Sequence, residues 1–258
     1  MGWLIAIVVF PLGLALGSFM TVVTARVPAG ESVVRPRSKC PSCNAEIANR
    51  DNVPVFGWVI LRGRCRSCGS RISARYPILE LSTALLFSGA FLVYESVWIG
   101  VAIAFLLMLM PAIAAIDIEH RIIPNRLMYP ALVAFPIYLT LIWLIGAPVD
   151  LAGMLIGFAS FGGALFVVAF VSRGMGMGDV KLAGLIGLVL GSLGLRYVGV
   201  AAGAAIVLGG VGAIVALIVG RGRKAAIPFG PYLAAGAVVS AFWGAQIAEW
   251  YLRTFLGV

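Results

Sequence analysis

Long stretches without a charged residue alternate with short polar segments along most of this chain. Six stretches contain 21 to 24 residues, and because about 20 apolar residues cross the hydrocarbon core of a bilayer, each predicts a membrane-spanning helix. The six are Gly2–Ala25, Ser96–Ile116, Leu127–Val149, Leu151–Ser172, Tyr197–Gly220 and Ala225–Ala248. Two stretches of 14 residues, Leu81–Tyr94 and Leu182–Leu195, reach a crossing length only if their helices begin earlier, near Tyr76 and Gly178. The pattern therefore predicts eight crossings.

The composition is that of an integral membrane protein. The chain has 258 residues, of which 62% are hydrophobic and 11% charged, whereas a soluble domain has about 25% charged residues. We therefore predict an all-α polytopic membrane protein. The first basic residue is Arg26, so the first stretch lacks the positive region of a cleavable signal peptide and is expected to remain as a helix. The chain divides into that helix (1–26), a polar loop (27–76) and the remaining helices (77–258).

Positive charge gathers in the polar loop. Segment Arg26–Tyr76 holds ten of the 19 basic residues and three acidic ones, a net charge of +7. By the positive-inside rule this loop is cytoplasmic, and the N-terminus lies outside. Alternation through the predicted helices leaves only Arg196 and Arg253 outside and adds to the cytoplasmic side Arg121, Arg126, Arg173, Lys181, Arg221, Arg223 and Lys224.

The basic loop has two interpretations. It orients the protein and attracts anionic membrane lipid, or it also forms a docking surface for a protein or a lipid head group. Nucleic acid is not an expected partner, because no nucleic-acid-binding motif accompanies the charge.

Every cysteine in the chain lies in this loop. Cys40, Cys43, Cys65 and Cys68 form two Cys-x-x-Cys pairs separated by 21 residues, as in a four-thiolate zinc ribbon with a slightly long middle gap. Two disulfides are the alternative, which a reducing cytoplasm disfavours. Four protein thiolates leave zinc no open position, so we predict a structural ion that supplies the fold of a loop poor in apolar residues.

Two aspartates stand where predicted helices meet the cytoplasm. Asp117 lies at the end of the third predicted helix and Asp179 at the start of the sixth, so both lie on the same side of the membrane. A carboxylate at the centre of a membrane helix costs about 2.5–3.5 kcal/mol and usually serves a function. If the two carboxylates meet, they share one proton, and one can activate water while the other acts as an acid. The spacing leaves open whether they meet.

Other hydrolytic chemistries lack their residues. His120 is the only histidine, and the chain has neither a His-Glu-x-x-His nor a Gly-x-Ser-x-Gly motif. The cysteines are assigned to the metal, so carboxylate chemistry remains. Gly176 and Gly178 allow a close backbone approach or a helix break before Asp179, and Pro124 is expected to end or kink the helix that carries Asp117.

Short motifs follow one another over nearly the whole chain. They are Gly17-Ser18-Phe19, Arg26-Val27-Pro28, the two cysteine pairs with Asn52-Val53-Pro54 between them, Tyr76-Pro77-Ile78-Leu79-Glu80, Asp117 to Pro124, Gly176-Met177-Gly178-Asp179-Val180-Lys181 and Pro228-Phe229-Gly230-Pro231-Tyr232. In this order they resemble the bacterial type IV prepilin peptidases, which are membrane aspartic proteases of the GxGD type.

The resemblance implies a function for each part of the chain. Asp117 and Asp179 would be the catalytic dyad of a transmembrane peptidase domain (77–258), following a first helix and a cytoplasmic zinc-binding loop domain (27–76). The substrates would be type IV prepilins or type II secretion pseudopilins, cut at the cytoplasmic face of the bacterial inner membrane. The cut follows a short basic leader ending in Gly and precedes a hydrophobic helix usually starting with Phe.

The resemblance also implies a second activity. Many relatives N-methylate the new N-terminus with S-adenosylmethionine, and the cysteine-loop half is associated with that subset. We therefore expect methyl transfer here, although the spacing assigns no residue to the methyl donor.

Three alternatives stay open at this point. The chain could be a peptidase without methyltransferase activity. It could be a transporter with proton-relay aspartates, although a transporter is expected to have internal repeats and charges near the bilayer midplane. It could also be a zinc-ribbon scaffold protein that tolerates loss of the Asp179 carboxylate.

Overall fold

The computed structural model describes residues 2–172, 174–219 and 228–257. The predicted cytoplasmic residues Arg173, Arg221, Arg223 and Lys224 lie outside this range. The long helices of the described part are α1 (Gly2–Arg26), α3 (Arg75–Val93), α4 (Val97–His120), α5 (Asn125–Leu144), α6 (Leu151–Gly157), α7 (Gly163–Ser172), α8 (Met177–Gly191), α9 (Leu195–Ile218) and α10 (Gly230–Tyr251). Shorter elements are η1 (Asn49–Asp51), α2 (Phe56–Ile60) and the π-helical η2 (Phe158–Gly162) and η3 (Leu252–Leu256).

The all-helical prediction is confirmed. Helical segments occupy all eight predicted positions, with α6, η2 and α7 forming one continuous helical run. Six of the eight are long and apolar enough to cross a membrane; α8, with 15 residues, and α10 remain predicted crossings. Both short stretches start early as expected, at Arg75 and Met177.

The last helix starts later than the last uncharged run. The run begins at Ala225, whereas α10 begins at Gly230 because Pro228 and Phe229 are not helical. Proline lacks a backbone N–H and restricts the residue before it, and Pro231 then takes one of the first helical positions of α10, where proline is tolerated.

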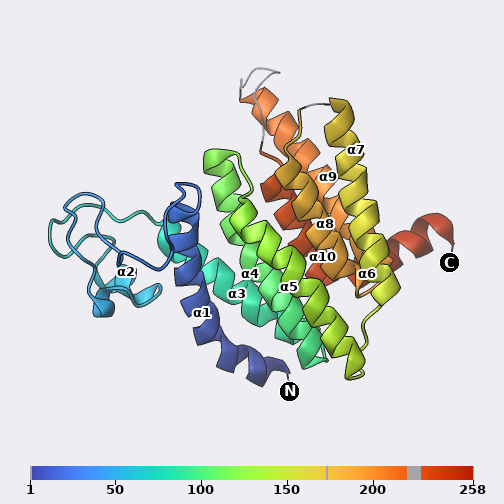
Figure 1. The fold of residues 1–258 in the computed structure, drawn as a ribbon, viewed down its shortest axis with the longest axis horizontal. Coiled ribbons are helices and arrows are strands. Elements are labelled where there is room, and N and C mark those ends of the chain that lie inside the picture. Colours follow the sequence, from blue (N-terminus) through green and yellow to red (C-terminus); the bar gives the residue numbers. More distant parts are fainter. Residues whose placement is uncertain (1, 173, 220–227, 258) are drawn as a thin grey trace.

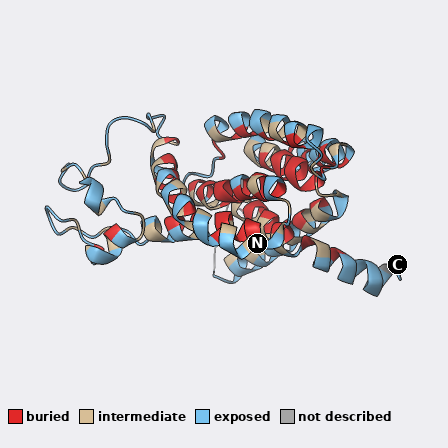
Figure 2. Cartoon of the chain, turned by 90° about the horizontal axis from the view of Figure 1, so that it is seen from below, coloured by how far each residue is buried: buried red, intermediate tan, exposed pale blue. Residues whose placement is uncertain are grey.

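Helix α4 lies at the centre of the bundle. Its most apolar 18-residue window is 72% buried, and it packs against α1, α3, α5, α8 and α10. Figure 2 shows buried residues gathered between the helices and exposed ones on their outer faces. Many of those outward residues are large and apolar, for example Ile218 at 78% exposure and Val8 at 75%. Such a surface suits lipid, because a bilayer solvates apolar side chains and water does not.

Helix α8 is enclosed as well. All ten residues from Leu182 to Gly191 are buried. Glycines allow α8 to approach α6 closely: a Cβ on Gly187 would collide with the carbonyl oxygen of Gly157, and one on Gly191 with that of Gly153. Small residues at such contacts let membrane helices pack backbone to backbone, which holds α8 in a fixed position.

Several connections meet at one end of the bundle. Figure 1 shows the α4–α5 turn, the segment that joins α7 to α8 and the end of α9 at the same end, opposite the N-terminus. The chain leaves α1 toward that end and forms the cysteine loop (27–74), which lies beside α1 (Figure 1). The two predicted aspartates therefore belong to neighbouring connections at a single end of the bundle.

Candidate active site and metal centre

Asp117 lies in the last turn of α4, as predicted. The helix ends at His120, and Arg121 adopts the left-handed conformation (φ 55°) that stops it, before Pro124 precedes α5. The side chain is 5% exposed. The backbone N–H of Gly230, in the first turn of α10, donates a hydrogen bond of 2.9 Å to Asp117 Oδ2. This donor fixes the direction in which the carboxylate points.

Gly230 has no room for a side chain. A Cβ at this position would lie 2.7 Å from Asp117 Oδ2. The 2.9 Å hydrogen bond from its N–H to Asp117 therefore depends on a residue without a side chain at position 230.

Asp179 lies in the first turn of α8 and is half-buried. The preceding Gly178 packs on the α4–α5 turn, where a Cβ would lie 2.8 Å from Ile123 Cβ. Ile123 follows Asp117 by six residues, so this glycine contact brings the start of α8 to the end of α4. Asp179 therefore follows directly on a contact with the turn that comes after Asp117.

Lys181 ties α8 to α5 beside the aspartates. Its Nζ donates hydrogen bonds to Asn125 Oδ1 at 2.7 Å and Tyr129 Oη at 3.0 Å, and it lies 4.6 Å from the centroid of the Tyr129 ring. The sequence placed Lys181 on the cytoplasmic side, and these bonds join the start of α8 to the start of α5.

The four predicted metal ligands come together in the cysteine loop. Their sulfur atoms all lie within 4.8 Å of one another, and Cys40 Sγ is 3.9 Å from Cys68 Sγ. All four thiols are free, so the disulfide alternative finds no support. In a tetrahedral site with Zn–S bonds of about 2.3 Å the sulfurs stand about 3.8 Å apart, and this cluster closes to that geometry with small movements.

The two Cys-x-x-Cys pairs are built alike. In each pair the N–H of the first cysteine bonds a carbonyl five residues on, Cys40 to Ala45 and Cys65 to Ser70. The residue after each second cysteine has a positive φ, Asn44 at 57° and Gly69 at 70°. Asparagine and glycine tolerate this conformation best, so local sequence shapes both turns.

Backbone N–H donors lower the pKa of a cysteine thiol in this cluster, whereas desolvation and neighbouring thiols raise the pKa of Cys43. The N–H groups of Cys43 and Ser42 lower the pKa of the Cys40 thiol to about 6. The Ala45 N–H lowers the pKa of Cys43, but desolvation and the other thiols outweigh it and raise that pKa to about 11. Four thiolates repel one another at this distance, and a divalent cation removes the repulsion. The residues therefore fit a closed four-thiolate metal site.

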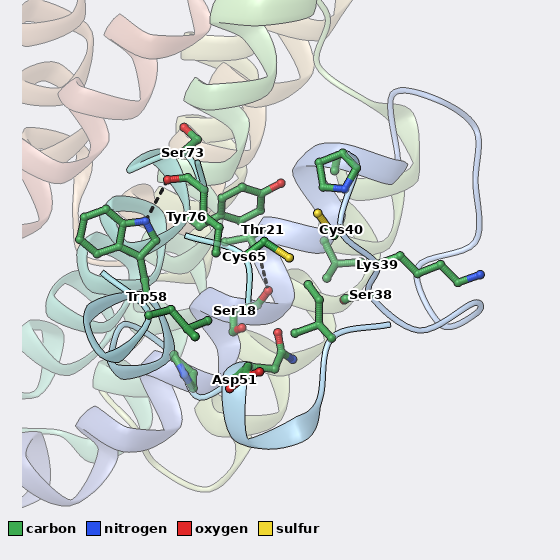
Figure 3. Close-up of a pocket in the computed structure, with 18 of the residues that line it drawn as sticks. Ser18, Thr21, Ser38, Lys39, Cys40, Asp51, Trp58, Cys65, Ser73 and Tyr76 are labelled. Carbon is green, nitrogen blue, oxygen red and sulfur yellow. Dashed lines mark hydrogen bonds between the residues drawn. The ribbon is translucent and has the colours of Figure 1, made fainter. Parts of the chain in front are cut away.

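A cavity of about 770 Å³ lies between the cysteine loop, α1 and the start of α3. Figure 3 shows Ser18 and Thr21 of α1 on one side and Cys40, Cys65 and Trp58 of the loop on others. Trp58 Nε1 donates to the carbonyl of Ile72 at 3.1 Å, which fixes the indole at the wall.

Glu80 of α3 lines this cavity and anchors the loop. Its carboxylate, in a residue 8% exposed, accepts a 2.7 Å hydrogen bond from the N–H of Val55 and has Ser18 as its other polar neighbour. Val55 adopts φ 62°, a conformation rare for a β-branched residue. The Glu80 carboxylate thus accepts a hydrogen bond from the backbone N–H of a strained loop residue.

Two family models cover most of the chain. The bacterial peptidase A24 N-terminal domain matches residues 12–94, and the type IV leader peptidase family matches residues 102–220. The chain is 34% identical over 254 residues to a protein of Bacillus subtilis (strain 168) named "Prepilin leader peptidase/N-methyltransferase", covering 97% of this chain and 99% of that one.

The chain belongs to the type IV leader peptidase family. A further relative of the same name, from Aeromonas hydrophila, is 32% identical over 286 residues, covering 98% of this chain and 96% of the relative. A protein of Escherichia coli O78:H11 named "Type 4 prepilin-like proteins leader peptide-processing enzyme" is 35% identical over 259 residues, with coverages of 89% and 91%. No solved structure matches the chain. The family resemblance is thereby confirmed, and the chain is an enzyme rather than a transporter or a scaffold protein.

The two family models divide the sites of this leader peptidase. Every residue that lines the 770 Å³ cavity, and all four cysteines, fall within 12–94, while Asp117 and Asp179 fall within 102–220. Gly230, whose amide holds Asp117, lies beyond both matched ranges.

Sequence reasoning missed two functional contacts. The Gly230 amide was unforeseen because the Pro-Phe-Gly-Pro motif indicated only a helix break; a glycine between two helix-restricting residues was the available signal. Glu80 belongs to one of the motifs of the resemblance, but nothing in its spacing indicates that it reaches the loop.

Proposed function

We propose that this leader peptidase hydrolyses prepilins and pseudopilins with Asp117 and Asp179 as its catalytic pair. The observation that carries the proposal is the presentation of the two carboxylates from the end of α4 and the start of α8, at one end of the bundle. The Gly230 donor orients one of them. Such a pair can act without a covalent intermediate.

In this mechanism the two carboxylates share one proton between them. The ionised carboxylate takes a proton from a water molecule, which attacks the scissile carbonyl carbon, while the protonated carboxyl donates to the carbonyl oxygen. Collapse of the tetrahedral intermediate returns a proton to the departing amine, and the C–N bond breaks. General acid–base catalysis of this kind contributes about 10²–10⁴-fold per group.

The proposed location is the bacterial inner membrane, with the N-terminus outside and the dyad facing the cytoplasm. Ten basic residues between Arg26 and Tyr76 support this orientation through the positive-inside rule. The substrate would present its basic leader at this face while its hydrophobic helix stays in the bilayer.

We also propose that the enzyme methylates the new N-terminus and that the cavity beside the cysteine loop holds S-adenosylmethionine. The names of the Bacillus and Aeromonas relatives support the activity. The cavity's 770 Å³ falls within the range of about 300–1,000 Å³ typical of ligand pockets. The bound donor would supply an electrophilic methyl group on a sulfonium.

The metal at Cys40, Cys43, Cys65 and Cys68 is proposed to be structural zinc. Two of these cysteines line the methyl-donor cavity, so the ion would shape its wall. A closed thiolate set gives the ion no position for substrate.

The test is to incubate the purified enzyme with a prepilin and S-adenosylmethionine and to follow cleavage and methylation separately by mass spectrometry. Asp117→Asn and Asp179→Asn are expected to lower cleavage by at least about 10³-fold, because each removes one of the two acid–base groups. Glu249→Gln, an exposed carboxylate on α10, is the control and is expected to cleave normally. Cleavage at the wild-type rate by both aspartate variants would show that the dyad is misassigned.

A further inference from the structure

Three carboxylates line the cavity between the loop, α1 and α3, and they differ in their partners. Glu46 Oε1 pairs with Arg37 Nε at 2.9 Å, and Asp51 accepts two hydrogen bonds from Arg66 at 2.6 and 2.8 Å. Glu80 has no cation within ion-pair distance among the residues that the structure describes. It is therefore the one cavity carboxylate in the described chain whose charge is not balanced by a neighbour.

An unbalanced carboxylate is costly where Glu80 lies. The residue is 8% exposed and belongs to a membrane-spanning helix, and a buried charge is expensive unless a cation or several hydrogen bonds compensate it. An ionised carboxylate can accept about four hydrogen bonds, whereas Glu80 has the Val55 N–H and the Ser18 side chain as polar neighbours. The remaining acceptor capacity is available to a ligand in the cavity.

Two cationic ligands could pair with Glu80, the N-terminal ammonium of a pilin and the sulfonium of the methyl donor, and the position of Glu80 favours the ammonium. The cavity wall next to it comes from α1, where Ala15, Ser18, Phe19 and Val22 lie within the span. Under the proposed function, a pilin whose helix sits in the bilayer would reach the cavity from this side with its N-terminal amine first. The opposite wall is formed by the polar loop and lies nearer to water, from which a soluble methyl donor arrives.

We propose that Glu80 binds the N-terminal ammonium of the cleaved pilin and accepts its proton. This inference rests on the proposed methyl transfer. The ammonium gives one proton to the Glu80 carboxylate, and the neutral amine attacks the methyl carbon of the donor. The C–S bond breaks as the N–C bond forms, so the sulfonium becomes a neutral thioether and the product is a methylammonium. The Glu80 proton is then released to water.

The first experiment measures methylation of a pilin that already lacks its leader, so that the result does not depend on cleavage. Glu80→Gln has almost the same size and its amide oxygen can still accept the Val55 hydrogen bond, so it removes the charge and keeps the anchor. We expect methylation to fall by about 100-fold or more, with cleavage of a prepilin unchanged. Glu31→Gln, an exposed carboxylate of the cysteine loop, is the control and is expected to methylate normally.

The second experiment measures binding without a methyl donor. A pilin N-terminal peptide with a free amine is compared with its N-acetylated form on the wild type and on Glu80→Gln. The wild type is expected to bind the free amine about tenfold or more tightly, and Glu80→Gln is expected to bind both peptides equally. The peptides share every other contact, so the difference reports the charge at Glu80.

Each other outcome rejects the inference in a distinct way. Wild-type methylation by Glu80→Gln means that the carboxylate takes no part. A loss of methylation together with a loop that becomes sensitive to a protease means that Glu80 only anchors the loop. Weaker binding of S-adenosylmethionine, with the amine preference intact, assigns Glu80 to the donor instead. If the wild type cleaves but never methylates, the proposed methyl transfer itself fails.

Discussion

The end of the bundle that carries the dyad and the cysteine loop beside it are stabilised in different ways. Ten consecutive residues of α8 are buried below Asp179, and the central window of α4 is 72% buried. In the loop, four of the 48 residues from Val27 to Ala74 are buried, namely Val27, Cys40, Gly57 and Gly63. Helix packing positions the aspartates, whereas the loop depends on a few polar contacts and the thiolate cluster.

This difference indicates that the proposed peptidase and methyl-transfer sites have separable supports. Asp117 and Asp179, the proposed dyad, are positioned by glycine contacts at Gly230 and Gly178. The loop is joined to the bundle by the Glu80 carboxylate and is braced internally by the Asp51–Arg66 pair, which lowers the pKa of Asp51. Damage to one region should therefore leave the other active.

The largest effect is expected from removal of the metal. A four-thiolate zinc site contributes about 10–16 kcal/mol of binding free energy to the fold that it holds, and the loop has little core of its own. A strong chelator, or Cys40→Ser combined with Cys65→Ser, should make the loop sensitive to a protease and abolish methylation. Cleavage of prepilin should persist. If cleavage is lost in step with methylation, the two regions are not independent.

The second effect tests the dyad side. In Gly230→Ala the new Cβ would lie 2.7 Å from Asp117 Oδ2 and displace the hydrogen bond from the amide. A hydrogen bond to a charged group contributes about 1.5–3 kcal/mol, so kcat for cleavage should fall about 10- to 100-fold. Methylation of a pilin without its leader should not change.

Gly163→Ala is the matched control for that substitution. A Cβ at Gly163 in α7 meets no atom within 4 Å, and the backbone there is helical. Cleavage by Gly163→Ala should equal that of the wild type. An equal loss in both glycine variants would mean that bundle stability, rather than the Asp117 contact, limits the reaction.

The smallest effect is expected at Lys181. Lys181→Met removes the hydrogen bonds to Asn125 and Tyr129 but keeps most of the side-chain volume. Because these contacts are exposed, each contributes about 0.5–1.5 kcal/mol at most, and cleavage should fall about two- to tenfold. Methylation kinetics measured on the same preparation serve as the internal reference, and a fall in both rates would contradict a local role near Asp179.

Much of the fold could be predicted because membrane helices leave a simple pattern. The uncharged runs located the helical segments, and the early starts at Arg75 and Met177 followed from the length that a crossing requires. The interruption of the run Leu151–Ser172 by η2 was not foreseen, since nothing in Phe158–Gly162 departs from an apolar helix. That π-helical turn depends on packing against α8.

The candidate site was predicted in part for a related reason. Asp117 and Asp179 stand out as carboxylates beside apolar runs, and the spacing of the cysteines is local. The aspartates and the cysteine cluster can therefore be recognised from the sequence alone. The contacts of Gly230 with Asp117 and of Glu80 with Val55 join residues 113 and 25 positions apart. Such pairs are decided by three-dimensional packing, which a single sequence does not encode in its spacing.

The shortness of α8 has a consequence for how water reaches the dyad. At about 1.5 Å per residue its 15 residues extend about 22 Å, against about 30 Å for a hydrocarbon core. A bilayer can thin around a short helix that lipid touches. Other helices rather than lipid surround α8, so the bilayer does not adapt to its length. The missing length is expected to leave a recess above Asp179, below the level of the lipid head groups. Hydration of this recess would let a peptide bond be cut while the substrate helix remains at its own depth in the membrane.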